Sequence, residues 1–385
     1  MEALFIISIA ILAYTYLGYG FIAKCLTLFT KKEIFPVLAD EDLPEITHII
    51  AAYNEEDILG EKITNCSSLN YPASKVKTII VTDGSTDRSS DIVKSDVRVI
   101  NYHSDKRAGK LAAVNRVIKE VESGITVFSD ANAILNNDAL RNIAYHFQNN
   151  MVGAVAGEKV VKSTDADDAT SSGEGLYWKY ESWLKKVDYQ LHSVVGAAGE
   201  LFAIRTHLYE CPKSNMLIED FITSITVAKK GYRVAYAPDA IASESSSASI
   251  AEENKRKVRI SAGGLQAVLH FKSLLNPFRY GILSFQYISH RVLRWTLAPL
   301  CLITALFSNF FLLSSGVAIY EILFILQILF YSLSVAGYYF NQQKIKIKIA
   351  FVPFYFSFMN LSIFMGLFRL LSGNYAVTWE KALRK

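Results

Sequence analysis

The stretch ITVFSDANAIL, residues 125–135, runs from a series of apolar β-formers into Asp130 and, two positions later, Asn132. Such a run predicts a buried strand. Side chains two positions apart on an extended chain point to the same face, so these two residues would present a pair of oxygen side chains at the strand end. Either they form a cation site, or they only form the turn that follows the strand.

The same order of apolar strand and polar loop recurs along the chain. Strands are predicted at 46–52, 76–82, 97–101, 125–132 and 152–157, with helices between them and at 137–148. This alternation predicts an α/β fold with a parallel sheet. Ligands of such sheets bind at the carboxyl ends of the strands, where three polar loops follow strands: Asn54-Glu55-Glu56, Asp83-Gly84-Ser85 and Asp130-Ala131-Asn132. Any one of these loops could be a simple turn.

Several common binding motifs are missing from the sequence. It contains no GxGxxG, no GxxxxGK[ST], no CxxC and no HExxH, which disfavours a dinucleotide cradle, a P-loop and a zinc site. A diphosphate bound without a glycine cradle needs Lys, Arg or a divalent cation, and Mg²⁺ is typically held by one or two carboxylates plus the phosphates. Asp130 fits that role.

The ends of the chain predict membrane helices. Of the 385 residues 51% are hydrophobic, and the runs 3–23, 296–320, 322–343 and 349–368 carry no charge. Each run is about the 20 residues that a helix needs to cross a bilayer, so spans are expected at roughly 3–23, 296–315, 322–341 and 349–368. A cleaved signal peptide is not expected because the first run lacks a basic start. The small net charge of +4 gives no reason to expect nucleic acid as a partner.

Lysines and arginines near the spans predict the orientation. With the N-terminus outside, the positive-inside rule is met by three clusters: Lys24, Lys31 and Lys32; Arg279, Arg291 and Arg294; and Lys344, Lys346 and Lys348. The protein is then a multi-pass protein of the cell membrane with a cytoplasmic central domain. Four crossings leave the basic tail outside, so either the tail is an exception or one apolar run does not cross.

An amphipathic helix is predicted at 274–295. Its apolar residues recur at spacings of three and four: Phe278, Ile282, Phe285, Ile288, Val292 and Trp295. Such a helix lies in the headgroup plane of a membrane. The alternative is a helix packed against the central domain.

Seven motifs in a fixed order carry a family resemblance. They are AAYNEE (51–56), TDGSTD (82–87), GKLAAVN (109–115), SDAN (129–132), GELFAIR (199–205), IED (218–220) and KRKVR (255–259). Over roughly 44–270 the chain resembles the family-two glycosyltransferases, the inverting, membrane-attached type that uses nucleotide sugars. The resemblance implies a GT-A fold. The expected organisation is a transmembrane helix (1–30), a cytoplasmic GT-A domain (44–272), the interfacial helix (274–295), about three transmembrane helices (296–372) and a tail (373–385).

The resemblance also implies roles for individual residues. The donor would contact Ala52, Tyr53, Glu55, Asp83, Lys110, Asp130, Arg256 and Arg259. Among these, Asp83 would accept from the base, uracil by preference. Asp130 and Asn132 would hold Mg²⁺ or Mn²⁺, Asp220 would be the general base, and the acceptor would lie near Gly199, Glu200 and Glu219.

Two positions depart from the family pattern. Asn132 stands where the family has a second aspartate, so it offers an oxygen ligand without charge. The polymerising members also carry Gln-x-x-Arg-Trp, whereas this chain reads Arg256-Lys257-Val258-Arg259-Ile260. The two arginines could hold the donor diphosphate, or the segment could be a basic, lipid-facing helix. The missing tryptophan puts the synthesis of a long polymer in doubt.

The expected function is therefore transfer of a sugar from a nucleotide donor, a UDP-sugar by preference, to a saccharide or lipid-linked acceptor. The product would enter a cell-surface polysaccharide or a glycolipid. Expected partners are the nucleotide sugar, the acceptor, the lipid bilayer and, in an oligomer, further copies of the chain. One alternative is a processive synthase that extrudes its polymer. Another is a catalytically silent scaffold subunit.

Overall fold

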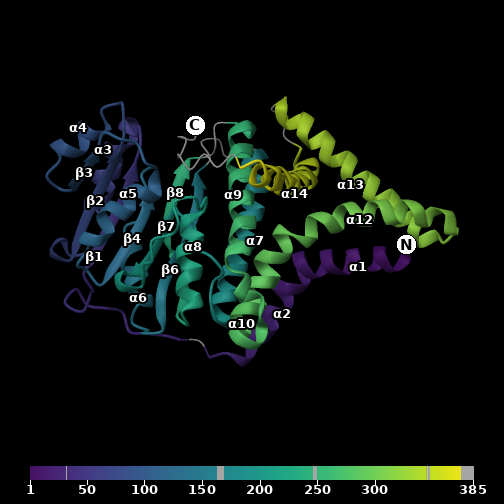
Figure 1. Cartoon of the computed structure of the whole chain (residues 1–385), viewed down its shortest axis with the longest axis horizontal. Helices are drawn as coiled ribbons and strands as arrows, with labels where there is room; N and C mark the ends of the chain where they lie inside the picture. The colour runs from purple at the N-terminus through teal and green to yellow at the C-terminus, as the bar shows by residue number, and fades with distance from the viewer. Residues whose placement is uncertain (32, 163–168, 246–248, 344, 346, 374–385) are drawn as a thin grey trace. The chain divides into compact units, whose positions relative to one another are not determined.

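The computed structural model describes residues 1–31, 33–162, 169–245, 249–343, 345 and 347–373 (Figure 1). The chain divides into two compact units, each described by itself. The α/β unit is built from Thr30–Lys162 and Asp188–Ser249, and the helical unit from Met1–Phe29, Ser163–Val187 and Ile250–Asn374. Apart from residue 373, the predicted C-terminal tail lies outside the described residues.

An eight-stranded sheet forms the centre of the α/β unit, in the order β3-β2-β1-β4-β7-β6-β8-β5. The strands are β1 Ile46–Ala52, β2 Val76–Asp83, β3 Ile100–Ser104, β4 Ile125–Asp130, β5 Ile134–Leu135, β6 Val152–Lys162, β7 Leu201–Arg205 and β8 Arg233–Ser245.

The sheet is mixed, which corrects the prediction of a parallel one. β1 to β4 are parallel, as their regular alternation with helices requires. β7 then enters between β4 and β6 and runs antiparallel to both, and β5 runs antiparallel to β8. The regular alternation ends after β6, where the 23-residue helix α7, Ala169–Leu191, precedes β7.

The carboxyl ends of β1, β2 and β4 lie side by side, as the positions of the polar loops predicted. All seven residues of β1 are buried, which is typical of an interior parallel strand. Its last residues pair with the ends of both neighbours, Ala52 with Thr82 of β2 and Ala51 with Asp130 of β4. The loops after β1, β2 and β4 therefore leave the sheet at the same edge.

Helices cover both sides of this sheet. The α/β unit contains α3 Glu56–Ser67, α4 Ser89–Ser95, α5 Lys110–Val117, α6 Ala139–His146 and α8 Glu219–Lys229, with 3-10 turns at Ala73–Lys75, Ile118–Glu120 and Thr206–Leu208. α3, α4 and α6 lie on one side, because their core clusters contain Ile46 and Ile50 of β1, and side chains four positions apart on a strand point to the same face. α5 lies on the other side, where Leu111 and Val114 line a cavity together with Ile49 and Ala51 of β1.

The helical unit contains the apolar ends of the chain. Its helices are α1 Glu2–Ala13, α2 Tyr19–Leu26, most of α7, α9 Ile250–His270, α10 Pro277–Tyr287, α11 Leu293–Trp295, α12 Leu297–Leu312, α13 Ala318–Gln342 and α14 Lys348–Leu371. π-helical turns lie at Tyr14–Gly18 and Ile288–Val292, and 3-10 turns at Thr27–Phe29, Lys272–Leu275 and Leu313–Ser315. Within the part of the chain that the structure describes, four segments are long and apolar enough to cross a membrane: Glu2–Phe29, Leu297–Ser315, Ala318–Gln342 and Ile349–Leu371. They coincide with the four predicted runs.

The segment predicted as one amphipathic helix, 274–295, is helical but interrupted. Gly281 has φ 52° and ψ −124°, which breaks the helical geometry inside α10. The chain then continues through the π-helical turn Ile288–Val292 into α11. A positive φ is readily accessible only to glycine, so the apolar spacing of three and four could not reveal this break.

Candidate active site

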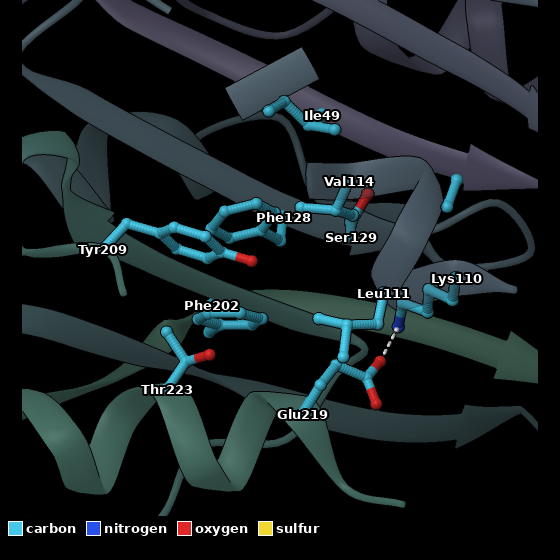
Figure 2. Close-up of a pocket in the computed structure, with 11 residues that line it drawn as sticks. Ile49, Lys110, Leu111, Val114, Phe128, Ser129, Phe202, Tyr209, Glu219 and Thr223 are labelled. Carbon is cyan, nitrogen blue, oxygen red and sulfur yellow. Dashed lines mark ion pairs between the residues drawn. The ribbon is translucent and has the colours of Figure 1, made fainter. Parts of the chain in front are cut away.

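Lys110, the first residue of α5, lies at the centre of a polar cluster. Its Nζ donates to Asp130 Oδ1 at 2.6 Å, and it lies 3.4 Å from Glu219 Oε1, a contact drawn in Figure 2. Asp130 ends β4 and Glu219 begins α8. Three segments that are far apart in the sequence therefore meet at one ammonium group.

Gly199 and Asp220 complete this cluster. A Cβ atom placed on Gly199 would lie 3.1 Å from Lys110 Nζ and 3.2 Å from Asp220 Oδ2. Because glycine has no side chain, both charged groups approach the backbone here. Five residues predicted from the sequence are thus close together in the structure: Lys110, Asp130, Gly199, Glu219 and Asp220.

The charges of this cluster shift the pKa values of two groups. Burial and the neighbouring Glu219 carboxylate raise the pKa of Asp220 to about 7, although Lys110 opposes the shift. Burial alone would lower the pKa of Lys110, but the carboxylates of Asp130, Glu219 and Asp220 outweigh it and raise that pKa. At neutral pH Lys110 is therefore a cation, whereas Asp220 can both accept and release a proton.

An apolar floor lies beside the cluster. Figure 2 shows a small cavity lined by Lys110 and Glu219 and by Phe128, Phe202 and Tyr209. The Phe128 and Phe202 rings stack with centroids 4.7 Å apart. The free volume is about 20 Å³, room for roughly one water molecule. The floor therefore shields one side of the charged groups from bulk solvent, which strengthens their interactions.

Asp83, at the end of β2, holds the loop that leads into α5. Its Oδ2 accepts from the backbone N–H groups of Ala108 at 2.9 Å and Gly109 at 2.6 Å. Its Oδ1 accepts from Arg116 Nη2 at 2.9 Å. Sequence reasoning missed this loop-holding role. The predicted contact of Asp83 with a base stays a prediction, since a carboxylate oxygen can accept more than one hydrogen bond.

The predicted nucleotide residues Ala52, Tyr53 and Glu55 follow β1. Ala52 and Glu55 are buried. Tyr53 is half-buried, and the guanidinium of Arg107 lies 3.8 Å from the centroid of its ring. The loop carrying Arg107 comes so close to Gly84, which has φ 67°, that a Cβ there would lie 2.6 Å from the Arg107 backbone nitrogen.

Hydrogen bonds join the loop after β1 to the loop after β2. Asn54, at φ 53°, donates its N–H to Ser85 Oγ at 3.1 Å and accepts from the N–H of Thr86 at 2.8 Å. Neither Ser85 nor Thr86 caps the following helix, because α4 begins only at Ser89 and both residues bond to Asn54 instead.

Glu200 belongs to a second buried charge cluster. Lys159 Nζ lies 2.5 Å from Glu200 Oε1 and also pairs with Glu244. Both Lys159 and Glu244 are buried. Glu200 is therefore fixed by a side-chain partner on β6, and its predicted contact with the acceptor stays a prediction.

Arg256 and Arg259 lie on α9 of the helical unit, whereas the other predicted site residues lie in the α/β unit. Arg256 donates to both carboxylate oxygens of Glu253, each at 3.1 Å. Their predicted contact with the donor diphosphate stays a prediction.

Asp130 and Asn132 fit a cation that is also held by a phosphate. Within the described ranges, no group of three or more His, Cys, Asp or Glu side chains could hold a metal ion. Asp130 is 21% exposed in its side chain, and Asn132 is half-buried in the turn closed by Ala133 N–H donating to Asp130 O at 3.2 Å. A carboxylate and an amide oxygen suit Mg²⁺ or Mn²⁺, which complete their coordination with water and substrate phosphate.

Two arginines of the site were missed from the sequence, Arg107 and Arg116. Both flank Gly109-Lys110 in the stretch DKRAGKLAAVNR. A basic residue on each side of a predicted helix start, facing an acidic loop, is the signal that could have found them.

Comparison with known proteins identifies the class. Residues 44–263, more than half of the chain, match the family model described as "Glycosyltransferase like family 2". The α/β unit has the mixed sheet and strand-end site of the GT-A glycosyltransferases. The chain belongs to glycosyltransferase family 2 and is a glycosyltransferase with a GT-A fold.

Individual relatives agree with this assignment. A beta-monoglucosyldiacylglycerol synthase of Synechocystis is 27% identical over 182 residues, 45% of this chain and 37% of that protein. A poly-beta-1,6-N-acetyl-D-glucosamine synthase of Staphylococcus aureus is 24% identical over 257 residues, 64% of this chain and 61% of that protein. The chain thus spans less than two thirds of both curated relatives.

A solved structure has the same fold over nearly the whole chain. The mannosyltransferase of Pyrobaculum calidifontis, in complex with GDP-Man and Mn²⁺, matches with a TM-score of 0.70 and 20% identity. The match covers 96% of this chain and 99% of that one. The four long apolar helices found among the described residues indicate that the protein is membrane-associated.

Proposed function

We propose that this glycosyltransferase moves a sugar from a nucleoside-diphosphate sugar to a hydroxyl of a saccharide or lipid-linked acceptor, with inversion at the anomeric carbon. The predicted donor is a UDP-sugar, and the reaction occurs at the cytoplasmic face of the cell membrane. The product enters a cell-surface polysaccharide or a glycolipid.

The observation that carries the proposal is the cluster around Lys110. One cation contacts Asp130 at 2.6 Å and lies beside Glu219 and Asp220. The same small region thus offers a positive charge for a diphosphate and a carboxylate whose pKa of about 7 suits proton transfer.

Asp220 acts as the general base. It takes the proton of the acceptor hydroxyl while that oxygen bonds to the anomeric carbon, and the bond from this carbon to the diphosphate breaks on the opposite face. General bases work best with a pKa near the operating pH, and contribute about a hundredfold to ten-thousandfold to the rate. A single displacement of this kind inverts the anomeric centre.

Lys110 and the Asp130–Asn132 turn receive the leaving diphosphate. The ammonium group of Lys110 is an electrostatic partner for phosphate oxygens. Asp130 and Asn132 would hold Mg²⁺ or Mn²⁺, which neutralises the charge that develops on the leaving group. Because Asn132 carries no charge, this pair should bind a cation more weakly than two aspartates.

The test is turnover by the full-length protein in membranes, with a panel of radiolabelled UDP- and GDP-sugars, with Mn²⁺ or with EDTA. Asp220→Asn should lower kcat by about a hundredfold or more and leave nucleotide binding intact. Glu210→Gln, which alters an exposed pair with Lys230, is the control and should keep full activity. Turnover of no donor, or an unchanged rate in Asp220→Asn, would refute the proposal.

Product length separates single addition from processive synthesis. Ile260 stands where polymerising members carry tryptophan, so we expect products extended by one sugar. A ladder of products would favour the processive alternative, in line with the activity named for the S. aureus relative.

A further inference from the structure

Lys62 of α3 is a buried lysine that the proposed mechanism does not use. It is fully buried, with 0% exposure. Lysine is almost never fully buried unless it is paired, because an ammonium group loses its hydration there. The hydrogen-bond partners of Lys62 Nζ should therefore explain why this residue is buried.

Both bonds go to the segment that carries Asp130. Lys62 Nζ donates to Ser129 Oγ at 2.9 Å and to the carbonyl of Ala133. Ser129 precedes Asp130 and Ala133 follows Asn132, so one ammonium group ties the two ends of the Asp130–Asn132 turn together.

Asn65, one helical turn after Lys62, forms hydrogen bonds with the next part of the same segment. Its Nδ2 donates to the carbonyl of Leu135 at 2.8 Å, and its Oδ1 accepts from the N–H of Leu135 at 2.9 Å. Two side chains of α3 therefore bind the segment from Ser129 to Leu135 at three backbone groups and one hydroxyl.

Ser129 also contacts a buried histidine. Its Oγ lies 2.8 Å from His48 Nε2, and His48 Nδ1 lies 3.8 Å from Cys66 Sγ. His48, Ser129 and Cys66 are all buried. The contacts that run from Lys62 through Ser129 and His48 to Cys66 therefore restrict the movement of the turn.

We propose that Lys62 and Asn65 are positioning residues that hold the Asp130–Asn132 turn in the geometry that binds the cation and the donor diphosphate. The inference rests on the proposed role of Asp130 and Asn132. It goes beyond that role because it makes α3, a helix outside the polar cluster, responsible for the conformation of the turn.

Two variants remove these bonds. Lys62→Met keeps the chain length but removes Nζ, and leaves the buried carbonyl of Ala133 without this donor. Asn65→Ala removes both bonds to Leu135 and affects a side chain that is only half-buried, so it should fold even if Lys62→Met does not. The control is Leu59→Ala, a buried residue of the same helix that packs in the core and should lower the unfolding temperature as well.

The measurement is calorimetric binding of UDP and of GDP to the full-length protein in detergent, with Mn²⁺ and with EDTA. Loss of a residue that orients metal ligands typically costs about tenfold to a hundredfold in affinity. We expect that loss in Mn²⁺ for Lys62→Met and Asn65→Ala, little change in EDTA, and wild-type binding for Leu59→Ala. In turnover assays the two positioning variants should need more Mn²⁺ for half-maximal activity.

Three results would contradict the inference, and they are distinguishable. Wild-type binding in both positioning variants would show that the turn does not depend on α3. An equal loss in Leu59→Ala would reduce the effect to general destabilisation. If the wild-type protein binds neither nucleotide in Mn²⁺, the proposed function itself fails and the inference falls with it.

Discussion

At the scale of single residues, the pH dependence of activity reports on Asp220. Its pKa of about 7 is raised by burial and by Glu219 and opposed by Lys110. Because the base must be deprotonated, kcat/KM should rise with pH and level off above about 7. Glu219→Gln removes the like charge and should move this rise to lower pH, whereas Lys110→Met removes the cation and should move it to higher pH. Shifts in the same direction would contradict the assigned network.

The same carboxylate should also make stability depend on pH. The pKa of Asp220 rises from 3.8 to about 7 on folding, so the folded protein binds this proton more tightly. The resulting stabilisation is complete below the unfolded value of 3.8 and is lost as the pH rises through about 7. Thermal unfolding of Asp220→Asn should therefore depend less on pH between 4 and 8 than that of the wild type. Identical pH profiles would place Asp220 in a more polar environment than the structure has.

The motifs predicted the residues at the centre of the site but not the residues that hold them in position. The residues around Lys110 could be found because chemistry requires their types in a known order. Lys62, Arg107 and Arg116 lie outside these motifs. The charge pattern around Gly109-Lys110 could have pointed to the two arginines, but Lys62 gave no such signal, since a lone cation in a predicted helix usually faces solvent. Only the folded chain shows Lys62 beneath the Asp130 turn and Arg116 against Asp83.

At the scale of elements, Asp83 links β2 to the start of α5. Arg116→Met removes the donor to the buried Asp83 Oδ1, and an unsatisfied buried group costs about 1–3 kcal/mol. We expect a matching loss in the free energy of unfolding, together with weaker UDP binding because the loop before Lys110 loosens. Lys106→Met, an exposed residue of the same loop, is the control. Unchanged stability in Arg116→Met would argue against this link.

Glu181 has the same kind of role in the helical unit. It is buried on α7 and pairs with Arg291 at 2.7 Å, Arg294 at 3.0 Å and His290 at 3.2 Å. Removing one partner of a buried ion pair costs about 3–5 kcal/mol, because the remaining charges stay buried. Glu181→Gln should therefore unfold at a clearly lower temperature in detergent, with Lys255→Met on α9, whose side chain is 66% exposed, as a surface control. A wild-type unfolding temperature would mean that water reaches the arginines.

Element order was predictable only where local rules apply. β1 to β4 alternate with helices, and their parallel pairing follows from that pattern. The antiparallel insertion of β7 follows no local signal, since β7 pairs with β4 across some 70 residues of sequence. The break of α10 at Gly281 could not be predicted either, because it depends on the φ angle of a single residue.

At the scale of the whole molecule, the positive-inside rule predicts a cytoplasmic α/β unit, and the native cysteines can test it. Of the four cysteines, Cys66 and Cys301 are buried, Cys25 is half-buried in α2, and Cys211 of the α/β unit is exposed. A membrane-impermeant maleimide should therefore leave Cys211 unmodified in intact cells and label it after permeabilisation. Cys211→Ser should abolish the labelling and so assign it. Labelling of Cys211 in intact cells would place the α/β unit outside and reverse the orientation of all four spans.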